Sequence, residues 1–222
     1  MNYKLSPSDL TFLYEGCKRC FYHKVVNEIS KPSIPIPGIF SKIAGLLKNH
    51  YNLKRTEELH ADLPPGTVRY GERYVESQNI RFPNVHNTCF IRGRFDIVIE
   101  FDDKTYGVID FKTGNPESEF SNIYSRQLHA YAYALENSAY GALSLSPVSM
   151  LGLLYFYPTE IGQSNIEWLS YNARIYLIKI QKDSKTFLAF VGEVLNLLES
   201  PEIPNSAQDC LWCSYVNKIT KK

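Results

Sequence analysis

Two aspartates and a lysine stand close together in the segment "GRFDIVIEFDDKTYGVIDFKTG", residues 93–114. Asp96 and Asp110 each interrupt an apolar, strand-like tract, and Lys112 follows the second acid by two positions. An acid within a sheet costs free energy unless a cation pairs with it or it takes part in chemistry. These three side chains are therefore the first candidates for a catalytic site.

The strand period predicts that the two acids meet. Alternate residues of a strand share a face, and we expect antiparallel strands over roughly 88–101 and 105–113. With Asp102-Asp103-Lys104 as the loop, paired residue numbers sum to 206, which places Asp96 opposite Asp110. At about 5 Å between Cβ atoms two carboxylates repel each other unless a cation lies between them. Lys112 shares their face.

This arrangement is typical of a divalent-metal site. Mg²⁺ takes one or two carboxylates together with waters and phosphate oxygens, and such a metal lowers the pKa of a bound water and stabilises a phosphodiester under attack. A neighbouring lysine can orient or deprotonate that water. The alternative is a solvated sheet face on which Lys112 is only an ion-pair partner, because an Asp-x-Lys triplet is common. Spacing alone does not decide between the two.

Three segments in order, "GRFD", "VIDFKTG" and "QLHAY", resemble the PD-(D/E)XK nuclease superfamily, specifically its RecB-like branch. In that branch an Asp follows Gly-x-x, a strand carries Asp-x-Lys, and a helix carries Gln-x-x-x-Tyr. The resemblance implies these roles: Mg²⁺ or Mn²⁺ ligands Asp96, Asp110 and the Phe111 carbonyl, catalytic Lys112, and site-lining Gln127 and Tyr131. Gln127 and Tyr131 share one helix face by their spacing. Without the upstream motif they would describe an ordinary amphipathic helix.

One position departs from the family pattern. RecB-like exonucleases commonly carry a histidine four residues after a glycine on an earlier helix, whereas "GIFSKI" has Lys42 after Gly38. That ligand is therefore missing or displaced. The sequence offers six substitutes without choosing among them: His50, His60, Glu57, Glu58, Glu72 and Glu76.

Four of the five cysteines form two C-x2-C pairs, Cys17 with Cys20 and Cys210 with Cys213. Two such pairs indicate a tetrathiolate metal site, here one that staples the two ends of the chain together. RecB-like nucleases of the CRISPR-associated and AddB types have a terminal staple around a [4Fe–4S] cluster, usually with one N-terminal and three C-terminal cysteines. The two-and-two arrangement makes Zn²⁺ a competitor, and we expect the cluster by a small margin. Cys89 is expected in the core.

Composition restricts the partners. The 222 residues, 44% of them hydrophobic, can form one domain with a sizeable core. A net charge of +1 excludes a global basic signature, so DNA would be held locally, with Arg92 and Arg94 beside the acids. No apolar run of 18 residues and no secretory leader pattern occurs, which predicts a cytoplasmic protein that contacts no membrane and keeps its thiols reduced.

The predicted elements alternate in type. Helices are expected in 6–16, 39–55, 121–141 and 184–200, strands in 20–29, 88–101, 105–113, 148–158 and 166–180, and a loop over 201–222. This order predicts an α/β fold with a central mixed sheet flanked by helices. The resemblance makes it a single restriction-endonuclease-like domain over 1–222, with the termini stapled by a metal centre.

The leading hypothesis is a metal-dependent DNA nuclease that hydrolyses phosphodiester bonds, with exonuclease action on single-stranded or end-containing DNA, in repair, recombination or CRISPR-type processing. One alternative is a non-catalytic nucleic-acid-binding module in which the missing histidine marks lost activity. Another is an accessory subunit beside a helicase or integrase. No Walker motif is present, so unwinding would require such a partner.

Overall fold

A computed structural model of the chain describes residues 1–32, 35, 37–116 and 121–220. It contains α1 (Tyr14–Gly16), α2 (Lys18–Val26), α3 (Gly38–Tyr51), α4 (Ser121–Glu136), α5 (Ser184–Glu199) and α6 (Leu211–Thr220). The strands are β1 (Asn2–Leu5), β2 (Gly66–Gly71), β3 (Tyr74–Glu76), β4 (Thr88–Arg94), β5 (Ile97–Phe101), β6 (Tyr106–Thr113), β7 (Val148–Gln163) and β8 (Leu169–Ile180). A π-helical segment, Asp9–Leu13, precedes α1, and a 3₁₀ turn spans Thr56–Glu58.

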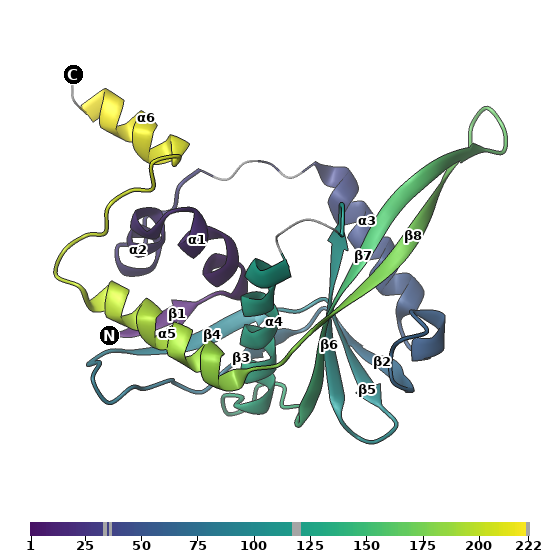
Figure 1. Cartoon of the computed structure of the whole chain (residues 1–222), viewed down its shortest axis with the longest axis horizontal. Helices are drawn as coiled ribbons and strands as arrows, with labels where there is room; N and C mark the ends of the chain where they lie inside the picture. The colour runs from purple at the N-terminus through teal and green to yellow at the C-terminus, as the bar shows by residue number, and fades with distance from the viewer. Residues whose placement is uncertain (33–34, 36, 117–120, 221–222) are drawn as a thin grey trace.

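The central sheet has the strand order β2-β5-β6-β7-β8 (Figure 1). Its β6–β7 pair is parallel and its other pairs are antiparallel, so the sheet is mixed, as predicted. A parallel pair needs a crossover connection, which α4 supplies between β6 and β7. A smaller sheet, β1-β4-β3, continues from it.

Helices cover both faces of the central sheet at β5 and β6. Ile97, Ile99 and Ile109 pack in a cluster with Tyr51 of α3, whereas Val98 and Val108 pack in the main core with α4 and α5. The strands are therefore apolar on both faces, which is typical of a sheet between two helical layers. The predicted α/β class is confirmed. Asp110 and Lys112 have the parity of Val108, and Lys112 contacts Gln127 of α4.

The predicted hairpin register is confirmed for the β5–β6 ladder, although the predicted Asp96–Asp110 pair is not part of that ladder. Ile97 pairs with Ile109 and Val98 with Val108, so paired numbers sum to 206. The amide of Phe101 donates to the carbonyl of Thr105 at 2.9 Å, which leaves 102–104 as the loop.

The strand predicted over 88–101 is broken, however, and its two parts lie in different sheets. β2–β5 and β3–β4 share one antiparallel register, because Gly71 pairs with Ile97 and Tyr74 with Arg94. Between these two ladders the two paired segments bend together. Glu72 has a φ of 33° there, and its backbone amide donates to the carbonyl of Asp96 at 2.9 Å. The bend carries Asp96 out of the ladder and places it beside Glu72.

Two other predictions were wrong. The segment 20–29, rich in β-branched and aromatic residues, lies mostly in helix α2, where Cys20 and Phe21 are buried. Strand propensity is overridden there by the burial of one helix face. The predicted loop over 201–222 contains helix α6, whose one buried residue, within the described Leu211–Thr220, is Cys213. None of the described helices combines the length and the apolarity that crossing a membrane requires.

Candidate active site

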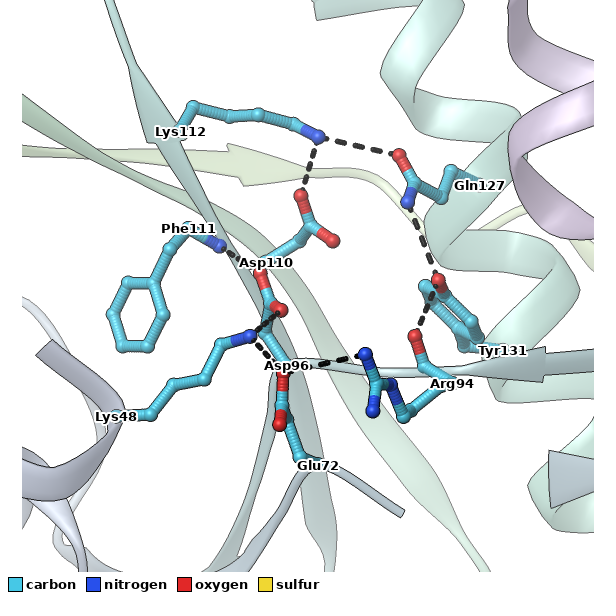
Figure 2. A network of polar contacts seen from close by, with 9 residues as sticks. All are labelled: Lys48, Glu72, Arg94, Asp96, Asp110, Phe111, Lys112, Gln127 and Tyr131. Atoms are coloured by element: carbon cyan, nitrogen blue, oxygen red, sulfur yellow. Dashed lines mark hydrogen bonds and ion pairs between the residues drawn. The ribbon is translucent and has the colours of Figure 1, made fainter. Parts of the chain in front are cut away.

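The two acids and the lysine meet where the bend reaches β6 (Figure 2). Asp96 Oδ2 accepts a hydrogen bond of 2.9 Å from the backbone amide of Phe111, the residue after Asp110. Asp110 is 4% exposed, and its Oδ2 lies 2.5 Å from Nζ of Lys112. The pKa of Asp110 is raised to about 6, because burial and the charge of Asp96 together outweigh the opposing charge of Lys112. Asp110 therefore does not lie on a solvent-exposed face of the sheet, which was the alternative left open by the sequence.

Helix α4 supplies the wall opposite Lys112. The Lys112 ammonium donates to Gln127 Oε1 at 3.2 Å and lies 4.0 Å from the ring centroid of Tyr124. Gln127 Nε2 donates to the Tyr131 hydroxyl at 3.3 Å, and that hydroxyl donates to the carbonyl of Arg94 at 2.8 Å. Both Gln127 and Tyr131 are buried. This chain of bonds fixes the Gln127 amide so that its oxygen faces Lys112 (Figure 2).

A second lysine, Lys48 of α3, enters the site from the other side. Its Nζ lies 2.7 Å from Asp96 Oδ1 and 2.5 Å from Glu72 Oε1, and its side chain is 14% exposed (Figure 2). Burial alone would lower the pKa of Lys48, but the hydrogen bonds to the two carboxylates outweigh it and raise that pKa. The same contact lowers the pKa of Glu72.

Sequence reasoning missed Lys48 altogether. The available signal was its position one helical turn from Ala44 and from Tyr51, on the face of α3 that is turned inward. Lys42, the residue that stands where the family pattern expects histidine, is exposed.

Among the six proposed substitutes for the missing histidine, Glu72 is the one that the described contacts join to the acids. The others are held elsewhere: His50 by Lys54, His60 by Asp62, Glu57 by Arg55, Glu58 by Lys54 and Glu76 by Arg92.

The two candidate DNA-binding arginines lie at the edge of this site. Arg94 has a guanidinium nitrogen 3.9 Å from Glu72 Oε1 and lies over the Tyr74 ring at 5.9 Å. Arg92, two residues earlier on the same face of β4, pairs with Glu76 at 3.3 Å. Both side chains are more than half exposed, so both remain open to an anionic ligand.

The residues from Lys48 to Asn217 match the family model of the PD-(D/E)XK nuclease superfamily. The chain belongs to the PD-(D/E)XK nuclease superfamily. The matched range contains every member of the acid–lysine site described above. The RecB-like branch within the superfamily stays a prediction.

Two other comparisons add little. The crystal structure of SSO0001 is similar at 14% identity and a TM-score of 0.47, over 96% of this chain and 84% of that one. No curated protein matched the chain.

The donor set fits the divalent metal that superfamily members use. Asp96, Asp110 and the Phe111 carbonyl offer hard oxygen atoms, the ligand type preferred by Mg²⁺ and Mn²⁺. The carboxylate of Asp110 is buried beside a second acid, and this arrangement is electrostatically unfavourable without a cation. Lys48 and Lys112 supply monovalent cations there.

The cysteines form a separate cluster away from the acids. The thiol sulfurs of Cys17, Cys20, Cys210 and Cys213 all lie within 4.8 Å of one another. The predicted meeting of the two C-x2-C pairs is therefore confirmed. Cys89 is fully buried in the main core, as expected, and burial raises its pKa to about 12.

Proposed function

We propose that this member of the PD-(D/E)XK nuclease superfamily is a metal-dependent DNA nuclease. The observation that carries the proposal is the position of Lys112, whose ammonium lies between the buried carboxylate of Asp110 and the fixed amide of Gln127. A purely structural ion pair needs no series of hydrogen bonds to orient its lysine. A catalytic lysine does, because its ammonium must already point at the reacting phosphate before negative charge develops there.

Asp96, Asp110 and the Phe111 carbonyl would hold Mg²⁺ or Mn²⁺. When bound, such an ion activates a water and stabilises negative charge on the phosphate. Lys112 then orients the attacking water and offsets the charge on the phosphate oxygens. Gln127 holds the Lys112 ammonium in place. The Tyr131 hydroxyl accepts from the Gln127 amide and is itself fixed by its hydrogen bond to the Arg94 carbonyl.

Lys48 also takes part in the proposed mechanism. In the metal-free site its ammonium neutralises Asp96 and Glu72. A divalent ion held by Asp96 would compete with that ion pair, which would leave the Lys48 ammonium available to a substrate phosphate. Glu72 keeps Lys48 near the acids in both states.

Single-stranded or end-containing DNA is the substrate we propose. Phe12 packs edge-on against Tyr124, which carries Lys112 on its ring face. Phe12 also lines a cavity of about 1090 Å³ together with Trp212 and Tyr215. Exposed aromatic rings that lead away from a catalytic lysine favour stacking with unpaired bases. The arginines at the site edge would contact phosphates.

The test is a panel of single-stranded, blunt duplex and closed circular DNA, each with Mg²⁺, Mn²⁺ or EDTA. We expect cleavage of the first two substrates with metal and none with EDTA. Exonuclease action predicts that the closed circle survives. A helicase or integrase partner would be found by co-purification with the full chain.

A non-catalytic binding module is the second candidate, and one observation favours it. Lys48 already neutralises Asp96, and the family histidine is absent. In that case DNA binding would persist in EDTA, and no substrate would be cleaved with either metal.

A further inference from the structure

The two C-x2-C pairs lie at the starts of two helices. Cys17 directly precedes α2, and the amide of Phe21 donates to its carbonyl at 3.0 Å. Cys210 directly precedes α6 in the same way, since the amide of Ser214 donates to its carbonyl at 3.0 Å. Each motif therefore presents its two sulfurs from the first turn of a helix, where the helix dipole favours negative charge.

The distances between sulfurs distinguish the possible occupants. Cys17 Sγ lies 3.8 Å from Cys213 Sγ. Cys20 Sγ lies 3.7 Å from Cys210 Sγ and 3.5 Å from Cys213 Sγ.

A single tetrahedral zinc ion with Zn–S bonds of about 2.3 Å requires sulfurs about 3.8 Å apart. The four thiolates of a [4Fe–4S] cluster each bind a different iron, so they lie farther apart than four ligands of one ion. The four sulfurs all lie within 4.8 Å of one another, a spacing that matches the ligands of a single ion better than those of four separate irons. The arrangement therefore favours a single metal ion over the cluster that the RecB-like resemblance implies.

We propose that Cys17, Cys20, Cys210 and Cys213 bind one zinc ion that holds α6 against α2. Three of the four residues are buried, and no described carboxylate or imidazole joins their cluster. Such a closed all-sulfur set is typical of a structural zinc site without an open position for catalysis.

The proposed zinc site explains what holds helix α6 against α2. Cys213 is the one buried residue of the described helix Leu211–Thr220, while Leu211, Tyr215 and Ile219 are exposed. Without the metal little apolar burial would hold this helix. Loss of zinc should therefore release α6 first and lower the stability of the rest of the chain, because binding energy at such a site is folding energy.

The experiment is metal analysis of the full chain purified without air from cells supplied with both iron and zinc. We expect about one zinc per chain, as a four-thiolate site requires, with no acid-labile sulfide and no broad absorption near 400 nm. About four irons per chain with that absorption would overturn the proposal, and so would a chain that binds neither metal.

A second measurement follows α6 directly. The chain has two tryptophans, so Trp168→Phe leaves Trp212 as the only tryptophan, whose emission can be excited selectively at wavelengths beyond the tyrosine absorption band. A strong chelator should shift the Trp212 emission and expose 205–220 to chymotrypsin, and added Zn²⁺ should reverse both effects. Cys210→Ser, at the least buried ligand, should lose zinc, whereas Cys89→Ala should keep it. Unchanged zinc content in Cys210→Ser would contradict the assignment. None of these readouts depends on nuclease activity.

Discussion

Replacing Lys48 with methionine removes the ammonium between Asp96 and Glu72 and keeps most of the aliphatic stem. The Asp96 pair is mostly buried, since the side chains are 14% and 21% exposed. A hydrogen bond to a charged group of this kind contributes about 1.5–3 kcal/mol. Glu72 is 44% exposed, so its pair adds at most about 1 kcal/mol.

We therefore expect Lys48→Met to lower the free energy of unfolding in EDTA by about 2–3 kcal/mol. For a chain of this size that corresponds to a fall in Tm of about 5–10 °C. Saturating Mn²⁺ should recover at least half of the fall, because the ion neutralises the same carboxylates and no longer competes with the ammonium. Metal should thus raise the Tm of Lys48→Met more than that of the wild type.

Thermal unfolding followed by circular dichroism, with EDTA or Mn²⁺, measures both effects. Lys104→Met is the matched control, because Lys104 also pairs with a glutamate but its side chain is 81% exposed. Its Tm should change by less than about 2 °C. Equal metal-induced gains in Lys48→Met and the wild type would refute the proposed competition between Lys48 and the metal.

Two further changes test the geometry of the site. In Gly93→Ala the new Cβ would lie 2.6 Å from Pro7 Cδ and 3.2 Å from the Tyr131 ring. Chemical denaturation should therefore show that the free energy of unfolding falls by about 1–3 kcal/mol. In the control Gly71→Ala the new Cβ meets nothing within 4 Å, so the fall should be smaller. Burial and the charge of Asp96 raise the pKa of Asp110 to about 6 in the folded protein. The stability that the protonated Asp110 carboxyl contributes without metal is therefore complete below its unfolded-state pKa of about 4, and it is lost as the pH rises through 6. Asp110→Asn should remove that fall from the Tm–pH profile in EDTA, and a profile identical to wild type would contradict the assignment.

The sequence was informative where the signal is local. The alternation around Asp96 and Asp110 and the three-residue loop between their strands determine the register without knowledge of the rest of the chain. The Gln127–Tyr131 spacing likewise places both residues on one face of α4.

What could not be predicted depends on long-range placement. Lys48 reaches Asp96 because α3 packs beneath β5 and β6, and no local pattern encodes that docking. Glu72 joins the site through a backbone bend with positive φ that its residue type does not indicate. The segment at Cys20 was misassigned as a strand because its aromatic and β-branched residues are buried by other helices rather than by a sheet.

Cleavage of labelled single-stranded DNA by Lys112→Ala, compared with wild type in Mg²⁺ or Mn²⁺, tests the central claim most directly. We expect metal-dependent cleavage by wild type, a loss of at least about a hundredfold in Lys112→Ala, and wild-type activity in the exposed control Lys104→Ala. Melting temperatures of the three proteins show whether each is folded. Undiminished cleavage by a folded Lys112→Ala, or no cleavage by wild type with either metal, would contradict the assignment of Lys112 as the catalytic lysine of a DNA nuclease.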